Sequence, residues 1–346
     1  MSVIKHIPRI KLTHSPTPLE YAPRLSELLG IELWIKRDDC TGLGGGGNKT
    51  RKLEFLLADA QSKCADTLVT LGGIQSNHAR QTAAAAAKFG FDCELVLQAV
   101  EGTPRSNYMN NGNILLDKLF GSKIHTLSDD QDIEEFAQGL MQQLSDHGKL
   151  PYLIPIGGSN SIGSLGYVQC VYELLDQLST DAIECSEEDQ NGRVNFDRII
   201  LATGSAGTQA GLLAGLIATN DQTEVLGINV SRPSSEQDPL VYQLLKQVMA
   251  DLNFDPKKVS ESMLRARVKT NGDYYGEGYG QVTEAMLEAV KTCAELEGLL
   301  LDPVYSGKAM AGLFDLCRKG EIAAGSRVMF LHTGGSVGLF AYQEAF

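Results

Sequence analysis

The chain has 346 residues, which exceeds the size at which one hydrophobic core usually keeps growing, so one large or two interlocked domains are expected. Its formal net charge of -13 disfavours a nucleic-acid partner, because binding to a phosphate backbone needs a clustered basic face. Seven cysteines without a CxxC pair argue against a disulfide framework or a metal site, and the lack of an apolar leader or of a long apolar run favours a cytoplasmic protein without a membrane partner.

Short β-rich runs alternate with longer helical patterns along the chain. The expected strands are 32–36, 67–71, 93–97, 123–126, 198–202, 225–230 and 327–331, and the expected helices include 52–61, 80–89, 133–144, 165–178 and 283–296. This alternation implies βαβ units. It therefore predicts an α/β fold with two open, twisted, mostly parallel sheets covered by helices. The most polar stretch, 179–192, predicts a surface loop.

A glycine-rich run at 42–50 leads into the first long helix and ends in Asn48, Lys49 and Thr50. It satisfies the spacing of a dinucleotide-binding fingerprint, but no acidic residue closes a strand about 20 residues further on. It also resembles a nucleotide phosphate loop, except that Asn48 precedes Lys49 and would turn the lysine by roughly 100° around a helix. A flexible loop with a solvated lysine is the third interpretation, and this run alone does not choose among them.

Two further strand-to-helix junctions carry small and hydroxyl residues. The first, which follows the strand at 67–71, contains Ser76, Asn77 and His78. Free backbone N–H groups at a helix N-terminus bind carboxylates and phosphates, although serine or asparagine there is also a common helix cap.

The second junction separates the strand at 198–202 from a helix expected at 209–218. It consists of Gly204, Ser205, Ala206, Gly207 and Thr208. A tight turn would explain the glycines, but its hydroxyl residues favour a phosphate site at the carboxyl edge of the sheet.

Tyr279 and Tyr305 lie in loops of the C-terminal third, one between glycines and the other near a proline. Phenols in such loops are candidates for a functional site, while packing is the alternative explanation. Shortly before the chain ends, the segment 332–335 adds a histidine, a threonine and two glycines.

Taken together, these segments resemble the fold-type II pyridoxal phosphate enzymes. The similarity is to the group that holds D-cysteine desulfhydrase, L-cysteate sulfo-lyase and 1-aminocyclopropane-1-carboxylate (ACC) deaminase. It spans almost the whole chain, and the motifs occur in the same order. They are residues 16–20, 36–39, 47–54, 75–78, 204–208, 302–305 and 332–335.

The resemblance implies that pyridoxal 5'-phosphate is the cofactor and that Lys49 holds it as a Schiff base. Lys49 would then act as the base above Cα of the substrate. Asn77 would contact the ring hydroxyl, residues 204–208 would hold the phosphate, and Ser306 would face the pyridine nitrogen. No metal is implied.

The implied substrate is a small amino acid. Its carboxylate would bind at residues 76–78, and Tyr279 and Tyr305 would flank the reacting carbon. The preferred reaction is α,β-elimination from D-cysteine to pyruvate, ammonia and hydrogen sulfide. Elimination of sulfite from L-cysteate and deamination of ACC are the alternatives within the group.

Ser306 bears on the choice among these reactions. The deaminases resemble this chain but look to have glutamate at this position, where a carboxylate would keep the ring nitrogen protonated. A neutral hydroxyl leaves a weaker electron sink, which suffices when a thiolate or sulfite departs readily. Sulfur elimination is therefore expected, but the sequence does not place an arginine near Cβ that would identify a sulfonate substrate.

The resemblance also implies a small α/β domain at 49–155 and a large cofactor-binding domain formed by 1–48 and 156–346. The cofactor would lie in the cleft between them, and a homodimer is expected. A nucleotide-binding oxidoreductase and a non-catalytic binding protein are the alternatives from other functional classes.

Overall fold

The structure, a computed structural model, describes residues 3–100, 106–179, 195–255 and 259–346. Its strands are β1 (Leu19–Tyr21), β2 (Glu32–Arg37), β3 (Thr67–Gly73), β4 (Asp92–Gln98), β5 (Lys123–Leu127), β6 (Pro151–Ile154), β7 (Arg198–Thr203), β8 (Glu224–Asn229), β9 (Lys269–Asn271) and β10 (Arg327–His332).

The longer helices are α2 (Lys49–Ser62), α3 (Asn77–Phe89), α6 (Ile133–Asp146), α7 (Ser161–Ser179), α8 (Gly207–Ala218), α9 (Ser234–Asp251), α11 (Glu284–Glu297) and α12 (Ser306–Arg318). The shorter ones are α1 (Pro23–Leu29), α4 (Ser106–Asn110), α5 (Asn113–Leu119), α10 (Glu261–Arg267) and α13 (Gly338–Ala341). The surface loop expected at 179–192 falls, from residue 180 onward, outside the described residues.

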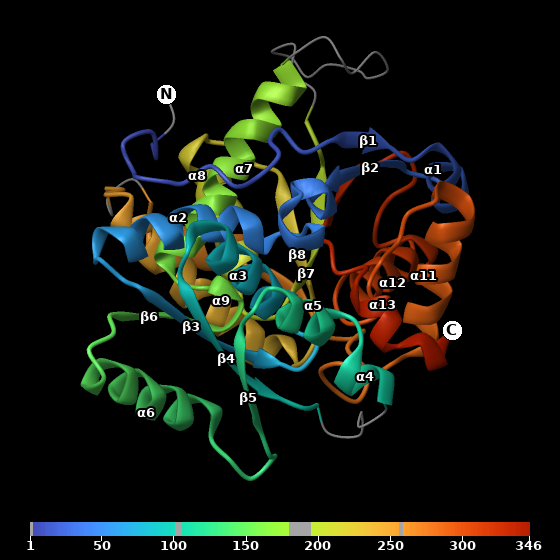
Figure 1. Cartoon of the computed structure of the whole chain (residues 1–346). Helices are drawn as coiled ribbons and strands as arrows, with labels where there is room; N and C mark the ends of the chain where they lie inside the picture. Colours follow the sequence, from blue (N-terminus) through green and yellow to red (C-terminus); the bar gives the residue numbers. More distant parts are fainter. Residues whose placement is uncertain (1–2, 101–105, 180–194, 256–258) are drawn as a thin grey trace.

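The strands form two sheets, which are visible as separate layers in Figure 1. The larger sheet has the order β1-β2-β10-β7-β8-β9, and all its neighbours are parallel except the β1–β2 pair. The smaller sheet has the order β5-β4-β3-β6 and is parallel throughout. The α/β class with two mostly parallel sheets, predicted from the sequence, is confirmed.

Helices cover both faces of the larger sheet because its strands are apolar on both sides. Along β10, Val328 and Phe330 face the layer that contains α1, α11 and α12. Met329 and Leu331 alternate with them and face the layer that contains α7, α8 and α9. Two apolar cores therefore lie on opposite faces of this sheet and fix its carboxyl edge in place.

The smaller sheet is covered in the same way. On one face Val69 and Leu71 of β3 pack against α6, which lies at the lower left of Figure 1. On the other face Leu68 packs against Leu53 and Leu57 of α2 and against the alanine-rich helix α3. The small side chains of α3 allow this helix to lie close to the sheet.

The seven strands expected from the sequence are all present. The strands that sequence patterns did not indicate, β1, β6 and β9, have only three or four residues each. All strands of the smaller sheet lie between residues 67 and 154, inside the segment proposed as the small domain. The division at 49–155 itself stays a prediction.

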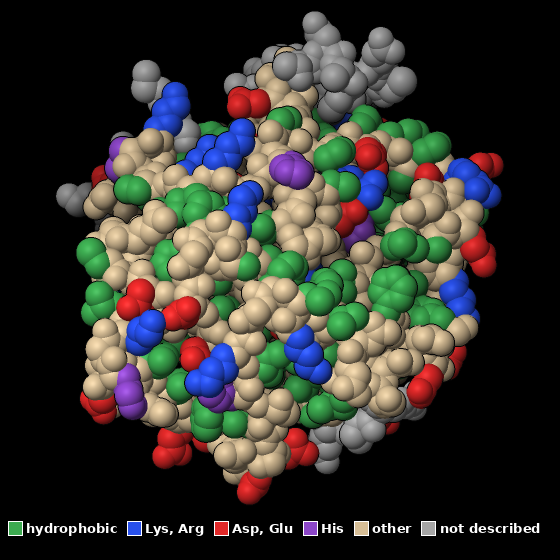
Figure 2. All heavy atoms as spheres, in the orientation of Figure 1, with side chains coloured by type: hydrophobic (Ala, Val, Ile, Leu, Met, Phe, Trp, Pro, Cys, Tyr) green, Lys and Arg blue, Asp and Glu red, His purple; other side chains and the backbone are tan. Residues whose placement is uncertain are grey.

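On the face shown in Figure 2, acidic and basic side chains are interspersed. Among the described residues, no helix combines the length and the apolar character needed to cross a membrane.

Candidate active site

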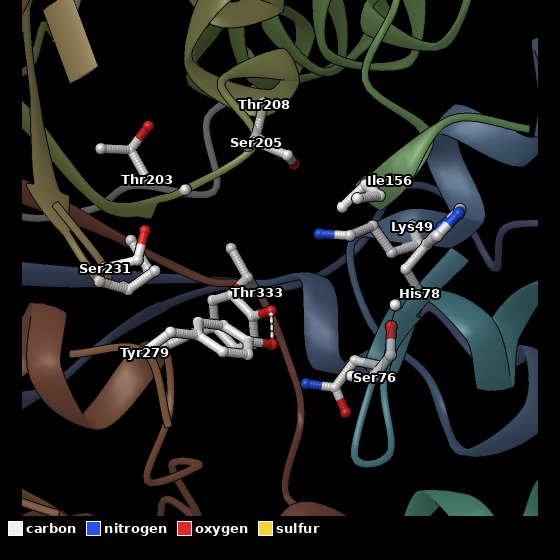
Figure 3. A pocket seen from close by; sticks show the side chains of 18 of the residues that line it. Lys49, Ser76, His78, Ile156, Thr203, Ser205, Thr208, Ser231, Tyr279 and Thr333 are labelled. Atoms are coloured by element: carbon white, nitrogen blue, oxygen red, sulfur yellow. Dashed lines mark hydrogen bonds between the residues drawn. The ribbon is translucent and has the colours of Figure 1, made fainter. Parts of the chain in front are cut away.

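A cavity of about 380 Å³ lies at the carboxyl ends of strands from both sheets. Parallel α/β sheets bind ligands at this edge, where loops lead from strands into helices. Its walls, shown in Figure 3, are formed by residues that lie far apart in the sequence. They include Asn48, Lys49, Ser76–His78, Thr203–Ala206, Thr208, Val230–Arg232, Tyr279, Tyr305 and Thr333.

Lys49 is the first residue of α2, and its side chain reaches into the cavity (Figure 3). Its amine donates a hydrogen bond to Asn48 Oδ1 at 3.2 Å and lies 5.9 Å from the ring centroid of Tyr305. Burial lowers the pKa of Lys49 to about 8, while the carboxylate of Asp302 opposes this shift. A substantial fraction of the amine is therefore neutral and nucleophilic near physiological pH.

The start of α2 is fixed by a buried ionic network two residues beyond Lys49. The guanidinium of Arg51 donates to Asp38 at 2.8 Å and to Glu173 of α7 at 2.8 and 3.0 Å. Lys36 of β2 also contacts Glu173, at 2.6 Å. Lys36 lies in β2 and Asp38 follows this strand directly. The network therefore ties α2, and with it Lys49, to the larger sheet and to α7.

The phosphate cradle predicted at residues 204–208 forms the N-terminus of α8. Ala206 adopts a left-handed backbone conformation with φ of 67° at the N-cap of α8, a conformation found in backbone turns that bind anions. A Cβ on Gly207 would lie 2.5 Å from Ser159 Oγ, so only glycine fits there. The hydroxyls of Ser205 and Ser159 lie 2.8 Å apart.

Lys52 lies beside the predicted phosphate cradle, 2.9 Å from where a Cβ on Gly207 would stand, and sequence patterns did not single it out. Its amine is fully buried and donates to Gly157 O and Ser159 Oγ, both at 3.0 Å, and it forms no ion pair with a described carboxylate. Burial and the nearby Lys49 hold its pKa well below its usual value. A buried amine without a counter-ion beside a helix N-terminus fits the phosphate of a cofactor, which would restore its charge.

Ser76, Asn77 and His78 all line the cavity at the start of α3. Ser76 is also the helix cap, because its hydroxyl accepts a hydrogen bond from the backbone N–H of Ala79 at 3.1 Å. His78 Nε2 lies 2.8 Å from Thr70 Oγ1, and burial holds its pKa well below its usual value. His78 is thus neutral, and a carboxylate here would be bound by N–H groups and the helix dipole.

Tyr279, labelled in Figure 3, and Tyr305 have their hydroxyl oxygens 2.5 Å apart and their ring centroids 5.8 Å apart. Burial raises the pKa of both phenols. One phenol donates to the other, so the pair keeps one further hydroxyl hydrogen available to a ligand.

Two predicted site residues, Gly207 and Ser306, do not line the cavity wall. Ser306 is engaged elsewhere. Its hydroxyl donates to Asp302 Oδ1 at 2.6 Å and accepts from the backbone N–H of Asp302 at 2.8 Å. Thr333, which follows β10, lines the cavity instead. The contact of Ser306 with the ring nitrogen stays a prediction, and Thr333 is a second candidate for it.

The lining is electrostatically one-sided. Among the described residues it contains Lys49 and Arg232 but no aspartate or glutamate. Arg232 follows β8, and its guanidinium forms no ion pair with a described carboxylate. Its Nε lies 3.4 Å from Ser231 Oγ. Among the described residues no cluster of histidine, cysteine or carboxylate side chains could hold a metal.

The structure therefore joins Lys49, residues 76–78, residues 204–206 and Thr208 with both tyrosines in one cavity. Sequence reasoning missed Lys52, Ser159 and Thr333. The segment 47–54 included Lys52 and the segment 332–335 included Thr333, but a basic or hydroxyl residue carries no distinctive signal until its contacts are known. Ser159 lies outside every motif.

Comparison with known proteins is consistent with this geometry. A family model described as "Pyridoxal-phosphate dependent enzyme" matches residues 10–334. The chain is 44% identical over 339 residues to a D-cysteine desulfhydrase of Klebsiella pneumoniae (strain 342), and the match covers 98% of this chain and 97% of the relative. A D-cysteine desulfhydrase of Salmonella typhi gives the same identity and coverage.

Solved structures are similar over nearly the whole chain. A crystal structure described as an ACC deaminase homologue has a TM-score of 0.84 at 38% identity and covers 99% of this chain and 96% of its own. Maize serine racemase has a TM-score of 0.63 at 17% identity and covers 95% and 92%, which shows a shared fold alone.

Proposed function

Because the chain belongs to the family of pyridoxal-phosphate-dependent enzymes, we propose that it uses this cofactor to eliminate sulfur from D-cysteine. D-Cysteine and water would yield pyruvate, ammonia and hydrogen sulfide. The observation that carries the proposal is the 44% identity, over nearly the full length, to D-cysteine desulfhydrases. A lysine amine and a pair of phenols in one cavity supply groups that such a reaction needs.

The cofactor, when bound, supplies an aldehyde for the substrate amine and a ring that takes up the electron pair left at Cα. Lys49 would hold the aldehyde carbon, and its amine, once displaced by the substrate amine, would remove the proton from Cα. The lowered pKa of Lys49, about 8, supports both roles because each needs the neutral amine. Residues 204–208 and Lys52 would hold the phosphate.

The neutral phenols of Tyr279 and Tyr305 would act at Cβ. The free hydroxyl hydrogen of the pair would be donated to the departing sulfur, and the second phenol would stabilise the first through their 2.5 Å contact. The N–H groups at the start of α3 would orient the substrate carboxylate, since Ser76 and Asn77 line the same cavity.

A substrate panel tests this function. D-cysteine, L-cysteine, L-cysteate and β-chloro-D-alanine are assayed for pyruvate, and ACC is assayed for 2-oxobutyrate. We expect D-cysteine to have the highest kcat/KM, and Lys49→Ala to abolish turnover and the visible absorbance of the bound cofactor. Lys63→Ala, which removes an exposed lysine of the turn after α2, is the matched control. Borohydride labelling at a lysine other than Lys49, or preferred turnover of ACC, would refute the proposal.

L-Cysteate is the second candidate substrate, and Arg232 is the observation that favours it. A sulfonate at Cβ needs a fixed cation, and Arg232 is a cavity-lining guanidinium without a described carboxylate partner. Its backbone carbonyl is held by Asn229 Nδ2 at 3.1 Å, which fixes where the side chain begins.

Replacement of Arg232 by Gln separates the two substrates. If Arg232 binds a sulfonate, KM for L-cysteate should rise at least tenfold while KM for D-cysteine changes little. An equal rise in KM for both substrates would instead assign Arg232 to a group that takes part in both reactions, such as the cofactor phosphate.

A further inference from the structure

Asn77 is held in the cavity by a second asparagine, Asn113, the first residue of α5. The amide nitrogen of Asn113 donates to Asn77 Oδ1 at 3.0 Å and to the backbone carbonyl of Gln75 at 3.1 Å. Asn113 is fully buried, and it does not line the cavity. Its route to the cavity is therefore through Asn77.

Arg80 determines which way the amide of Asn113 points. Arg80 Nε donates to Asn113 Oδ1 at 2.8 Å. A guanidinium has only donors, so the atom of Asn113 that faces it must be the carbonyl oxygen. The amide nitrogen of Asn113 is then turned toward Asn77, and the atom of Asn77 that it meets must be an acceptor. Asn77 Oδ1 is used in this way, which leaves the NH2 group of Asn77 for the cavity.

The charge of Arg80 makes this orientation robust. Arg80 is fully buried on α3, and burial lowers its pKa to about 10, so it stays protonated at neutral pH. Its Nη1 also donates to the backbone carbonyls of Gly44 and Gly46 in the loop that precedes Lys49. One buried cation thus sets both this loop and the amide of Asn113.

Gln75 keeps Asn113 in register with α3. Its amide nitrogen donates to the carbonyls of Tyr108 and Asn111 at 2.6 and 2.8 Å, and its oxygen accepts from the backbone N–H of Asn113 at 2.9 Å. Each polar atom of the Gln75 amide has a partner, so the start of α5 cannot shift without breaking several hydrogen bonds.

We propose that Asn113 is a positioning residue that turns the amide of Asn77 so that its NH2 group donates to an anionic oxygen of the cofactor. The inference rests on the proposed role of Asn77 at the ring hydroxyl. A donor at that position favours the ionised hydroxyl and so contributes to cofactor affinity and to the visible spectrum.

Asn113→Asp is the sharpest test, because aspartate has nearly the same shape and still accepts from Arg80. Its second oxygen would face Asn77 Oδ1, so the amide of Asn77 would rotate and turn its own oxygen to the cavity. We expect the Kd of pyridoxal 5'-phosphate for the apoprotein to rise at least tenfold and the pH midpoint of the visible band to move upward. Asn113→Ala should raise Kd by a smaller factor.

The same substitution in an Asn77→Ala background distinguishes positioning from general structural damage. If Asn113 acts through Asn77, Asn113→Asp should change Kd less than twofold in that background. Asn110→Asp, on an exposed residue of the neighbouring helix α4, is the matched control and should bind as the wild type does.

Equal factors in both backgrounds, or an unchanged Kd and spectrum in Asn77→Ala alone, would overturn the proposal. Because the readouts are cofactor affinity and absorbance, a protein that binds the cofactor but fails to convert D-cysteine would refute the proposed function and still give an interpretable result for Asn113.

Discussion

Replacing Glu173 by Gln tests whether the buried network beneath α2 stabilises the protein. Glu173 is 9% exposed and accepts hydrogen bonds from Arg51, Lys36 and the backbone N–H of Thr17. The substitution leaves two buried cations with the single carboxylate of Asp38. The new glutamine amide would face Arg51, Lys36 and the N–H of Thr17, which can only donate hydrogen bonds. Its NH2 group would repel these donors, and its oxygen is a weaker acceptor than a carboxylate.

Two estimates of the cost agree. Removing one partner of a buried ion pair typically costs about 3–5 kcal/mol. Burial alone would raise the pKa of Glu173, but Arg51 and Lys36 outweigh it and lower this pKa from 4.5 to about 2, a net shift that corresponds to about 3 kcal/mol at neutral pH. Since the folded-state pKa is the lower one, this stability is present above pH 4.5 and is lost as the pH falls toward 2.

Urea unfolding of the wild type and of Glu173→Gln, followed by circular dichroism between pH 7 and pH 3, measures this contribution. The variant should be about 3 kcal/mol less stable at pH 7, and the difference should shrink by about 2 kcal/mol at pH 3. Glu295→Gln, on an exposed residue of α11, is the control and should change stability little. A difference that stays constant with pH would refute the electrostatic reasoning and leave only packing.

Further predictions concern the cofactor. Gly207→Asp should weaken binding of pyridoxal 5'-phosphate at least tenfold, because its carboxylate would compete with the phosphate for Lys52. Gly207→Ala measures the steric part of this effect. If Gly207→Asp retained as much cofactor after dialysis as the wild type, residues 204–208 would not hold the phosphate. Lys52→Met should also weaken binding at least tenfold, and it should do so less for pyridoxal, which lacks the phosphate. Thr333→Val should shift the visible absorbance of the bound cofactor more than Ser306→Ala does; the reverse order would restore Ser306 as the ring contact.

The fold followed from the sequence because strand and helix differ in hydrophobic period and alternate regularly here. Strands β7 and β10 are apolar on both faces, which is typical of buried parallel strands. The short strands β1 and β9 escaped notice because three residues carry no periodicity. β1 pairs with the next strand, β2, and β9 pairs with β8, so neighbouring strands define them rather than their own patterns.

Sequence patterns brought candidate residues to one cavity where residue type and local position suffice. The junction at 204–208 was indicated by its hydroxyl residues, whereas Lys49 was chosen by the resemblance, and both line the cavity except for Gly207. Lys52 and Asn113 were not predictable, because their roles depend on which groups face them across the fold. For Ser306 the sequence suggested a contact with the cofactor ring, but it could not reveal that the hydroxyl already donates a hydrogen bond to Asp302.

The walls of the cavity contain the starts of several helices. The N-cap residues of α2, α3, α8 and α12 are Asn48, Ser76, Ala206 and Tyr305, and all four line it. A helix N-terminus carries a partial positive charge of about half a unit. At α12 the carboxylate of Asp302 already accepts hydrogen bonds from the backbone N–H groups of Tyr305 and Ser306, so the other three helix starts supply the dipoles that are open to an anion.

This construction also explains how a chain with a net charge of -13 can bind an anionic cofactor. Exposed charges are screened within about 10 Å at moderate ionic strength, whereas dipoles directed into a cavity act at contact distance. The helix starts must therefore be held rigidly. A buried side chain anchors each of three by hydrogen bonds: Arg51 for α2, Asn113 for α3 and Asp302 for α12. Substitution of any of these three residues should reduce cofactor affinity before it reduces the content of secondary structure.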